Sequence, residues 1–156
     1  MSWWRDFPRT CFGSANSQER LAALIIAGRK RATVWNANEG CETAPGMLWT
    51  VTVADQPVAV IETISVAQRR FDDIDNDFAN EEGEGDKSLA YWRSVHEDFF
   101  RKECHFAPTM MLWCEHFRLI EALDLTLLAR AEQHVALEQQ EGETLVLELM
   151  RQSSQR

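Results

Sequence analysis

The chain has 156 residues, of which 45% are apolar and 26% charged, a size and composition typical of one folded domain. Its 25 Asp and Glu outnumber 16 Lys and Arg, and the net charge of −9 disfavours a protein that binds duplex nucleic acid over its whole surface. No apolar stretch approaches the roughly 18 residues of a membrane span, and Met1 to Asp6 lack the layout of a secretory signal. We therefore expect a cytoplasmic protein with no membrane partner.

Four cysteines are spread along the chain without a Cys-x-x-Cys pair, which argues against both a zinc ribbon and a disulfide scaffold. They are Cys11, Cys41, Cys104 and Cys114. Two of them neighbour His105 and His116, but a zinc site needs three or four converging ligands. We expect reduced structural thiols, no metal and no other cofactor.

Apolar spacing divides most of the chain into short helices and strands. Helical spacing predicts helices over 17–27, 74–82 and 88–102, and β-rich runs predict strands over 32–35, 47–53, 57–66 and 110–120. A turn at Asp55-Gln56 would join two of these strands in a hairpin. Together the elements predict an α+β fold built on a small barrel or a curled sheet.

The C-terminal 30 residues are harder to interpret. Leu145, Leu147 and Leu149 alternate with other residues, which predicts a strand. The segment 126–140 fits a helix or a strand, and residues 153–156 are expected to form a frayed end.

Acidic side chains gather between Asp72 and Asp86, where eight carboxylates fall within 15 residues. Such a run is most often a solvated loop. Glu81, Glu82, Glu84 and Asp86 could instead hold Mg²⁺ or Ca²⁺, although their spacing is not that of an EF-hand. A single carboxylate packed into a pocket here would have a raised pKa suited to proton transfer.

Lys30 and Thr33 are the side chains best suited to nucleophilic chemistry, because a desolvated lysine can activate a hydroxyl. Residues three apart on a regular strand point to opposite faces, so the two converge only if the chain breaks near Gly28. An exposed basic turn before a strand is the alternative. His96, on the predicted helix 88–102, fits a packing role better than a catalytic one.

Three segments carry a resemblance to the ASCH (activating signal cointegrator homology) domain family. The residues Gly28 to Thr33 resemble its Gly-x-Lys-x-x-Thr element, and Phe12-Gly13-Ser14 its Phe-Gly-Asp/Ser segment. The run from Phe71 through Glu-Gly-Glu-Gly-Asp to Phe100 resembles a bacterial branch of the family. The resemblance implies a PUA-like small β-barrel with flanking α-helices, which we assign to residues 1–124. Residues 125–156 have no counterpart in the resemblance, and we expect them to form a C-terminal extension packing on the same domain.

The resemblance also implies an activity, the hydrolysis of N4-acylated cytosine nucleosides such as N4-acetylcytidine by a Lys/Thr/Glu set. Its members fall on Lys30, Thr33 and Glu82. Thr33 would attack the acyl carbonyl, and Lys30 would accept its proton. Glu82 would orient the lysine or pass a proton to the leaving amine. The partner is then a small modified nucleoside.

The surrounding residues expected to bind substrate are Arg29, Arg31, Trp35, Asn36, Trp92 and Arg93. The same arginines and tryptophans suit the alternative that the resemblance implies, a single-stranded RNA-binding protein or Mg²⁺-dependent ribonuclease. A regulatory binder that has the pocket without turnover is a third possibility. The oligomeric state stays open.

Overall fold

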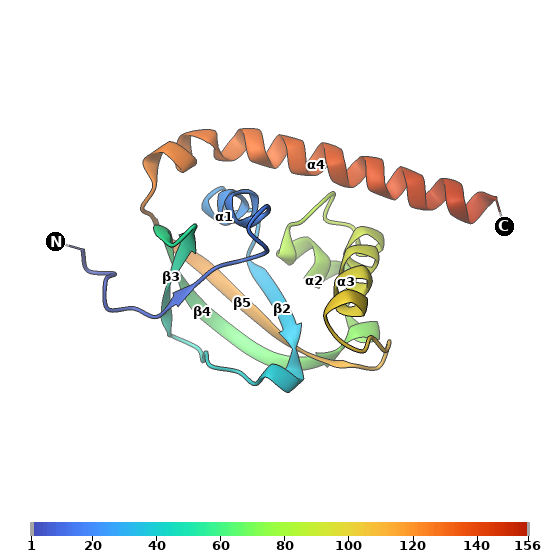
Figure 1. Cartoon of the computed structure of the whole chain (residues 1–156), viewed down its shortest axis with the longest axis horizontal. Coiled ribbons are helices and arrows are strands. Elements are labelled where there is room, and N and C mark those ends of the chain that lie inside the picture. The colour runs from blue at the N-terminus through green and yellow to red at the C-terminus, as the bar shows by residue number, and fades with distance from the viewer. Residues whose placement is uncertain (1, 156) are drawn as a thin grey trace.

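The computed structural model describes residues 2–155, which form a mixed five-stranded sheet and four α-helices (Figure 1). The strands are β1 (Arg9–Thr10), β2 (Ala32–Asn36), β3 (Leu48–Val53), β4 (Gln56–Arg70) and β5 (Met111–Ala122). The helices are α1 (Gln18–Ile26), α2 (Asn76–Glu82), α3 (Leu89–Glu103) and α4 (Leu125–Ser154), with 3₁₀ turns η1 (Ala37–Glu39) and η2 (Phe71–Asp73).

The sheet has the strand order β1-β3-β4-β5-β2, with β1 parallel to β3 and the other pairs antiparallel. The expected hairpin is formed by β3 and β4, although its turn lies at Ala54 and Asp55, with φ of 48° and 65°. Two left-handed residues match the twist of a two-residue hairpin. The α+β class is confirmed, but β1 and β2 are opposite edges, so the sheet is not closed into a barrel.

Side-chain caps fix the two helices that flank the acidic segment. Asp75 accepts a hydrogen bond from the Phe78 amide at the start of α2, and Ser88 accepts one from the Tyr91 amide at the start of α3. Helix α2 ends at Gly83, whose φ of 72° is left-handed. The acidic segment therefore leaves α2 by a sharp turn and enters α3 within a few residues.

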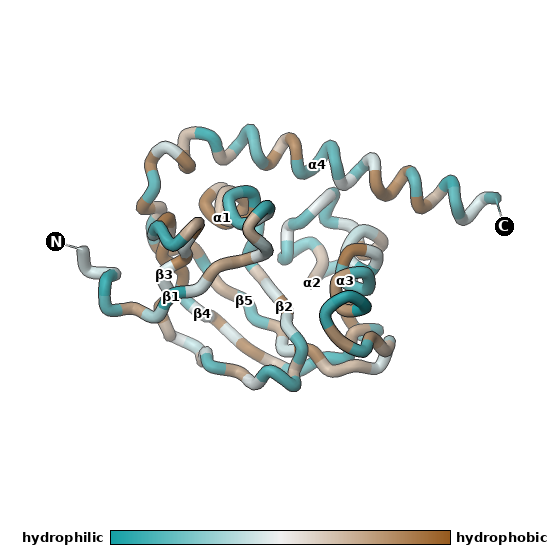
Figure 2. Tube along the Cα trace, viewed as in Figure 1, coloured by the Kyte–Doolittle hydropathy of each residue, from teal (hydrophilic) through white to brown (hydrophobic). Residues whose placement is uncertain are grey.

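Two apolar cores lie against the sheet, and the brown segments of Figure 2 mark their positions. The first joins α1 and α4 to the sheet, and includes Ile25, Val51, Ile61, Phe117 and Leu127. The second joins α2 and α3 to β2 and β5, and includes Phe71, Phe78, Trp92, Phe100 and Leu112. The chain thus brings the end of α2 and the start of β2 together where the two cores meet.

The strand predicted around Leu145, Leu147 and Leu149 is wrong, because residues 125–154 form one helix capped by Asp124. Leu145 and Leu149 are half-buried four residues apart on one helix face, whereas Leu147 is 55% exposed. Leu145 and Leu149 therefore belong to one apolar stripe of the helix, and the alternation of the three leucines in the sequence is a coincidence. The expected frayed end begins inside α4, and Arg156 lies outside the described residues. Among residues 2–155, no helix combines the length and apolar character that a membrane span requires.

Helix α4 runs over α1 and the loop between α2 and α3 (Figure 1). A Cβ atom at Gly142 would lie 2.2 Å from the backbone nitrogen of Asp86 and 2.4 Å from the carbonyl carbon of Gly85. Only a residue without a side chain allows this approach. Glu138, one helical turn earlier, accepts a 2.7 Å hydrogen bond from the Gly85 amide.

We expect Gly142→Ala to lower the free energy of unfolding by about 1–3 kcal/mol, the usual cost of overpacking a tight contact. Alanine favours a helix over glycine by about 1 kcal/mol, so the substitution would stabilise the protein if position 142 were not crowded. Urea unfolding measures the difference. The exposed Gln140→Ala on the same helix is the control, and a stabilised Gly142→Ala would contradict the close packing.

Candidate active site

A break between α1 and β2 positions Lys30. Gly28 has a φ of 79°, and the Lys30 amide donates to the Leu24 carbonyl at 3.0 Å. The next amide, of Arg31, donates to the Glu81 carbonyl at 2.7 Å and ties the segment to the end of α2. The Lys30 side chain is buried there, with 2% of its surface exposed. The alternative of an exposed basic turn therefore does not apply to Lys30.

The Lys30 ammonium faces four acceptor atoms. Its Nζ lies 2.7 Å from the Ala32 carbonyl oxygen, 2.9 Å from Glu84 Oε2, 3.5 Å from the Glu82 carbonyl oxygen and 3.6 Å from Glu82 Oε1. Burial disfavours the ammonium, but the Glu84 and Glu82 carboxylates outweigh this effect, so the pKa of Lys30 is raised. Lys30 is therefore a cation in the unliganded chain.

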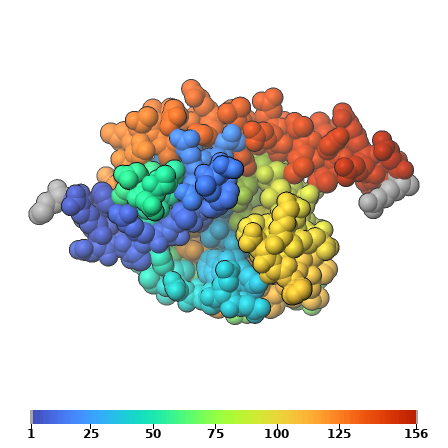
Figure 3. All heavy atoms as spheres, viewed as in Figure 1, coloured from blue at the N-terminus to red at the C-terminus, as the bar shows by residue number. Residues whose placement is uncertain are grey.

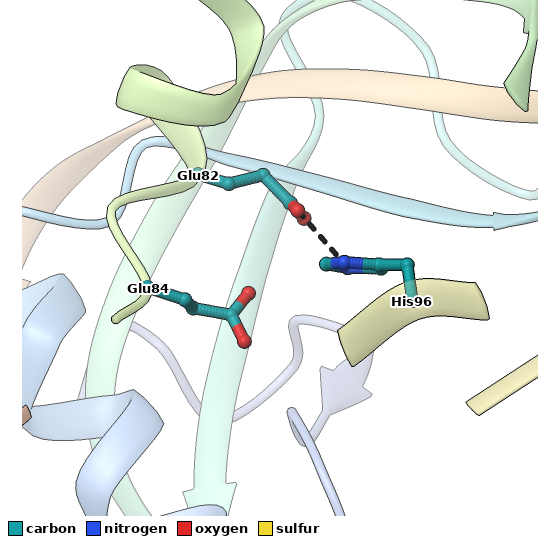
Figure 4. Close-up of side chains that lie close together, drawn as sticks. All are labelled: Glu82, Glu84 and His96. Atoms are coloured by element: carbon teal, nitrogen blue, oxygen red, sulfur yellow. Dashed lines mark ion pairs between the residues drawn. The ribbon is translucent and has the colours of Figure 1, made fainter. Parts of the chain in front are cut away.

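Glu82 is the centre of a second set of contacts, in which its carboxylate points toward His96 on α3 (Figure 4). Its Oε2 lies 3.1 Å from His96 Nε2 and also accepts a hydrogen bond from the Trp92 indole. Burial opposes its ionisation, but Lys30 and then His96 outweigh it and lower the pKa of Glu82 to about 2. Glu82 is therefore a buried carboxylate anion.

His96 completes the balance of charge in this cluster. Its Nδ1 lies 2.8 Å from the Trp92 carbonyl, which only accepts, so Nδ1 carries a proton. Burial lowers the pKa of His96, but Glu82 outweighs burial and the net shift is upward. With Glu82 ionised, Nε2 also donates. Lys30 and His96 thus balance the charges of Glu82 and Glu84.

Glu82, Glu84 and His96 are the one group of three within residues 2–155 whose ligand atoms lie within 4.8 Å of one another. A metal site would need an unprotonated His96 nitrogen and free carboxylate oxygens. Here His96 and Trp92 donate to Glu82, and Lys30 donates to Glu84. The chain's own cations already satisfy these groups, so the set does not fit a resident metal ion.

A cavity of about 450 Å³ lies beside this cluster, on the sheet face that carries the first core. In Figure 3 the surface is hollowed between the blue N-terminal segment and the cyan segment that follows β2. Its walls include Phe12, Trp35 and Trp49, together with the polar side chains of Thr33 and Glu115. The Phe12 ring connects the two sites, since its centroid lies 5.9 Å from Lys30 Nζ.

Thr33 stands directly opposite Glu115 in the antiparallel pairing of β2 and β5. Paired residues point to the same face of a sheet, and both side chains line the cavity. Thr33 has no hydrogen bond to Lys30 or Glu82 within the described chain. The link is through the backbone, because Lys30 Nζ holds the Ala32 carbonyl, one residue before Thr33. The structure therefore joins Lys30 to Glu82 and places Thr33 on the cavity wall next to them.

A chain of hydrogen bonds leads to Glu115 from β3, from β4 and from the loop that precedes β3. Trp49 Nε1 donates to Thr43 Oγ1 at 2.8 Å, Thr43 and Thr63 hydroxyls lie 2.6 Å apart, and Thr63 donates to Glu115 Oε2 at 2.8 Å. The indole only donates and the carboxylate accepts, so every proton in this chain points toward Glu115. One Glu115 oxygen is thereby held in place.

The remaining residues expected to bind substrate lie in different surroundings. Arg29 Nε donates to the Gly83 carbonyl at 2.7 Å, and its Nη2 donates to the Gly85 carbonyl and to Gln139 on α4. Arg29 therefore holds the loop after α2. Arg31 is exposed and pairs with Glu81 at 3.2 Å.

The side chains further along the chain divide between cavity, core and surface. Trp35 lines the cavity, with its indole donating to the Gly40 carbonyl at 2.7 Å. Asn36 caps η1 by accepting from the Asn38 amide. Trp92 is 2% exposed in the second core, and Arg93 is exposed on α3. Of the expected substrate-binding residues, Trp35 is the one in the cavity wall.

Sequence reasoning overlooked Glu115 and undervalued Glu84 and His96. Spacing along the chain places Glu115 between Cys114 and His116, which resemble metal ligands, and gives its carboxylate no role of its own. Its signal was strand alternation with Phe117, which places a carboxylate on a core-facing side of β5. Cys114, on the other face, is buried, which raises the pKa of its thiol to about 12. That thiol is structural, as expected.

The fold and the comparison with known families give the class of this protein. Residues 8–121 match the ASCH domain family, and the chain belongs to that family. A crystal structure of an ASCH domain from Lactobacillus crispatus is 34% identical, with a TM-score of 0.67, over 74% of this chain and 80% of that one. A protein from Enterococcus faecalis is 28% identical, with a TM-score of 0.65, over 74% and 81% of the two chains. No curated protein matches the chain in a comparison of sequences.

Removing the Glu82 charge should destabilise the fold strongly, because Lys30 and His96 lose their shared counter-charge. We expect Glu82→Gln to lower the free energy of unfolding by about 3–5 kcal/mol near neutral pH. The folded-state pKa of about 2 lies below the ordinary 4.5, so this contribution is present above pH 4.5 and is lost as the pH falls toward 2.

Denaturant unfolding at pH 7 and at pH 3 measures both effects. Glu81→Gln is the matched control, since Glu81 is half-buried and pairs only with the exposed Arg31 among the described residues. Equal losses in the two variants would show that Glu82 holds no buried cation in place.

Proposed function

We propose that this ASCH domain is an amidohydrolase that removes the acyl group from N4-acylated cytosine nucleosides. The observation that carries the proposal is the buried ion pair of Lys30 and Glu82, which adjoins a cavity whose wall includes Thr33. These are the three residue types of the family's amidohydrolase set. A hydroxyl, a buried cation and an open cavity together suit attack on an acyl carbonyl.

The cavity suits an uncharged nucleoside. Its volume of about 450 Å³ lies in the range of small-molecule sites. The rings of Phe12, Trp35 and Trp49 offer faces on which a pyrimidine could stack. Glu39, Glu42 and Glu115 outnumber the one cation of the wall, Arg9, so the lining repels phosphate. A nucleoside is therefore favoured over a nucleotide.

In the proposed reaction, Thr33 Oγ forms a bond to the acyl carbon and gives up its proton. The C–N bond then breaks, the cytosine nitrogen takes a proton and leaves, and water hydrolyses the threonine ester. Lys30 was expected to accept the Thr33 proton, but it is already an ammonium. We therefore assign Lys30 a fixed positive charge beside the cavity, with Glu82 keeping it charged, and the leaving nitrogen takes up the proton that Thr33 gave up.

The RNA alternative has weaker support from the basic side chains. The Arg29 guanidinium is occupied by two loop carbonyls and Gln139, and Arg31 is paired with Glu81. An acidic cavity wall also opposes a polyanion.

One assay separates the candidate functions. The protein is incubated with N4-acetylcytidine in EDTA, and conversion to cytidine is followed by ultraviolet absorbance. Turnover in EDTA supports the amidohydrolase. Absence of turnover with Mg²⁺-dependent shortening of a labelled oligoribonucleotide supports the ribonuclease, and binding of the nucleoside without turnover supports a regulatory binder.

Thr33→Val should abolish turnover, a fall of at least about 10²-fold in kcat, because the isosteric side chain has no nucleophile. Binding of N4-acetylcytidine, measured calorimetrically, should persist. Thr52→Val is the control, since Thr52 is a strand threonine outside the cavity wall. A Thr33→Val protein with normal kcat would exclude the threonine as nucleophile.

A further inference from the structure

We propose that Glu115 is the general base that takes the Thr33 hydroxyl proton. This inference rests on the proposed amidohydrolase reaction, and it assigns the proton transfer that Lys30, already an ammonium, cannot perform. Glu115 lies outside the Lys/Thr/Glu set, on β5 rather than on the acidic segment.

Strand register brings the two side chains together. Thr33 and Glu115 are direct partners across β2 and β5, a position at which Cβ atoms lie about 4.5–5.5 Å apart on the same face. Both side chains line the cavity. In the unliganded chain the Glu115 carboxylate bonds to Thr63, and catalytic hydrogen bonds commonly tighten only when substrate is bound.

The hydrogen-bond chain through Thr43 and Thr63 leaves Glu115 a free acceptor. It fixes Oε2 with a donated proton, while the described residues provide no hydrogen bond to Oε1. A carboxylate held at one oxygen and open at the other can receive a proton without first losing a partner. Glu115 lies at the cavity wall, where its second oxygen is available to Thr33 or to water.

Lys30 cannot fill this role in the same state. Its Nζ is protonated and donates toward the Ala32 carbonyl, Glu84 and Glu82, so it has no lone pair with which to accept a proton. Deprotonating it would leave two buried carboxylates without their cation, at a cost that the fold opposes. The acceptor must then come from the cavity, and Glu115 is the carboxylate paired with Thr33.

Its surroundings raise the pKa of Glu115 above that of an ordinary carboxyl group. Burial raises the pKa of Glu115, while the Thr63 hydrogen bond and the Lys30 charge act in the opposite direction. The other charged or titratable groups facing the cavity are Arg9, Cys11, Glu39 and Glu42. A raised pKa makes Glu115 a better proton acceptor than an ordinary surface carboxylate, provided that it is ionised at the working pH.

The proton balance of the cycle closes on Glu115. As the Thr33 oxygen bonds to the acyl carbon, its proton moves to Glu115 and the carbonyl becomes an oxyanion. Collapse breaks the C–N bond, and the cytosine nitrogen takes the proton from Glu115. Glu115 is then free to accept a proton from the water that attacks the ester. The Thr33 oxygen takes that proton back as the carboxylic acid leaves.

The decisive variant is Glu115→Gln, assayed with N4-acetylcytidine. The amide oxygen can still accept from Thr63, but the side chain cannot take up a proton. We expect kcat to fall by about 10²–10⁴-fold, with KM changed by less than about threefold. The control is Glu121→Gln, the same substitution at an exposed position of β5, which should leave kcat unchanged.

A pH profile distinguishes a base from a structural carboxylate. The wild-type kcat/KM should rise through the Glu115 pKa and level off above it, whereas a Lys30 base would keep it rising about tenfold per pH unit through pH 9. Thr63→Val removes the bond that favours the ionised form, so the midpoint should move to higher pH.

The outcomes separate the two proposals. An inactive wild-type protein would overturn the amidohydrolase and this inference with it. An active wild-type protein with Glu115→Gln within threefold of its kcat would overturn the base alone. If Glu115→Gln does not fold, the pH profiles test the base instead. A Thr63→Val protein whose kcat/KM profile keeps the wild-type midpoint, or a wild-type kcat/KM that keeps rising through pH 9, would overturn Glu115 as the base.

Discussion

A buried lysine between two carboxylates is the constraint on which the rest of this structure depends. A single charge without a partner is costly in a protein interior, so Lys30 requires Glu82 and Glu84 to lie where they do. Glu82 in turn requires His96 and Trp92 from α3. The position of one ammonium thus relates the start of β2, the end of α2 and the middle of α3.

The C-terminal helix contributes to the same constraint, although it lies outside the matched family region of residues 8–121. Glu138 holds the Gly85 amide, and Gly142 packs directly on the Gly85–Asp86 backbone. Arg29 binds the same loop through the Gly83 and Gly85 carbonyls and also bonds to Gln139 on α4. Glu84, which bonds to Lys30, is carried by this loop. Helix α4 therefore positions a residue of the site without reaching the cavity.

Local chemistry made much of this predictable. Helical apolar spacing and β-rich runs predicted the three short helices and the long strands, and the family resemblance placed Lys30 and Glu82 in one site. The long helix was missed because alternating leucines on a half-exposed helix have the same spacing as a strand. The role of Glu115 depends on the register of β2 against β5, and that of His96 on its contact with Glu82 in another helix. The spacing of residues along the sequence does not reveal either.

The assignment of a base illustrates what the three-dimensional arrangement adds to residue types. A lysine and a threonine three residues apart suggest a base and its nucleophile, and the break at Gly28 does bring Lys30 beside the threonine's strand. However, a lysine whose protons all face acceptors behaves as a fixed charge, while a carboxylate with one oxygen free can still accept. Hydrogen-bond saturation, rather than residue identity, therefore distinguishes Lys30 from Glu115. The fold separates the two tasks: Lys30, which lies where the start of β2 meets the end of α2, supplies the positive charge, and Glu115 on β5 supplies the proton acceptor.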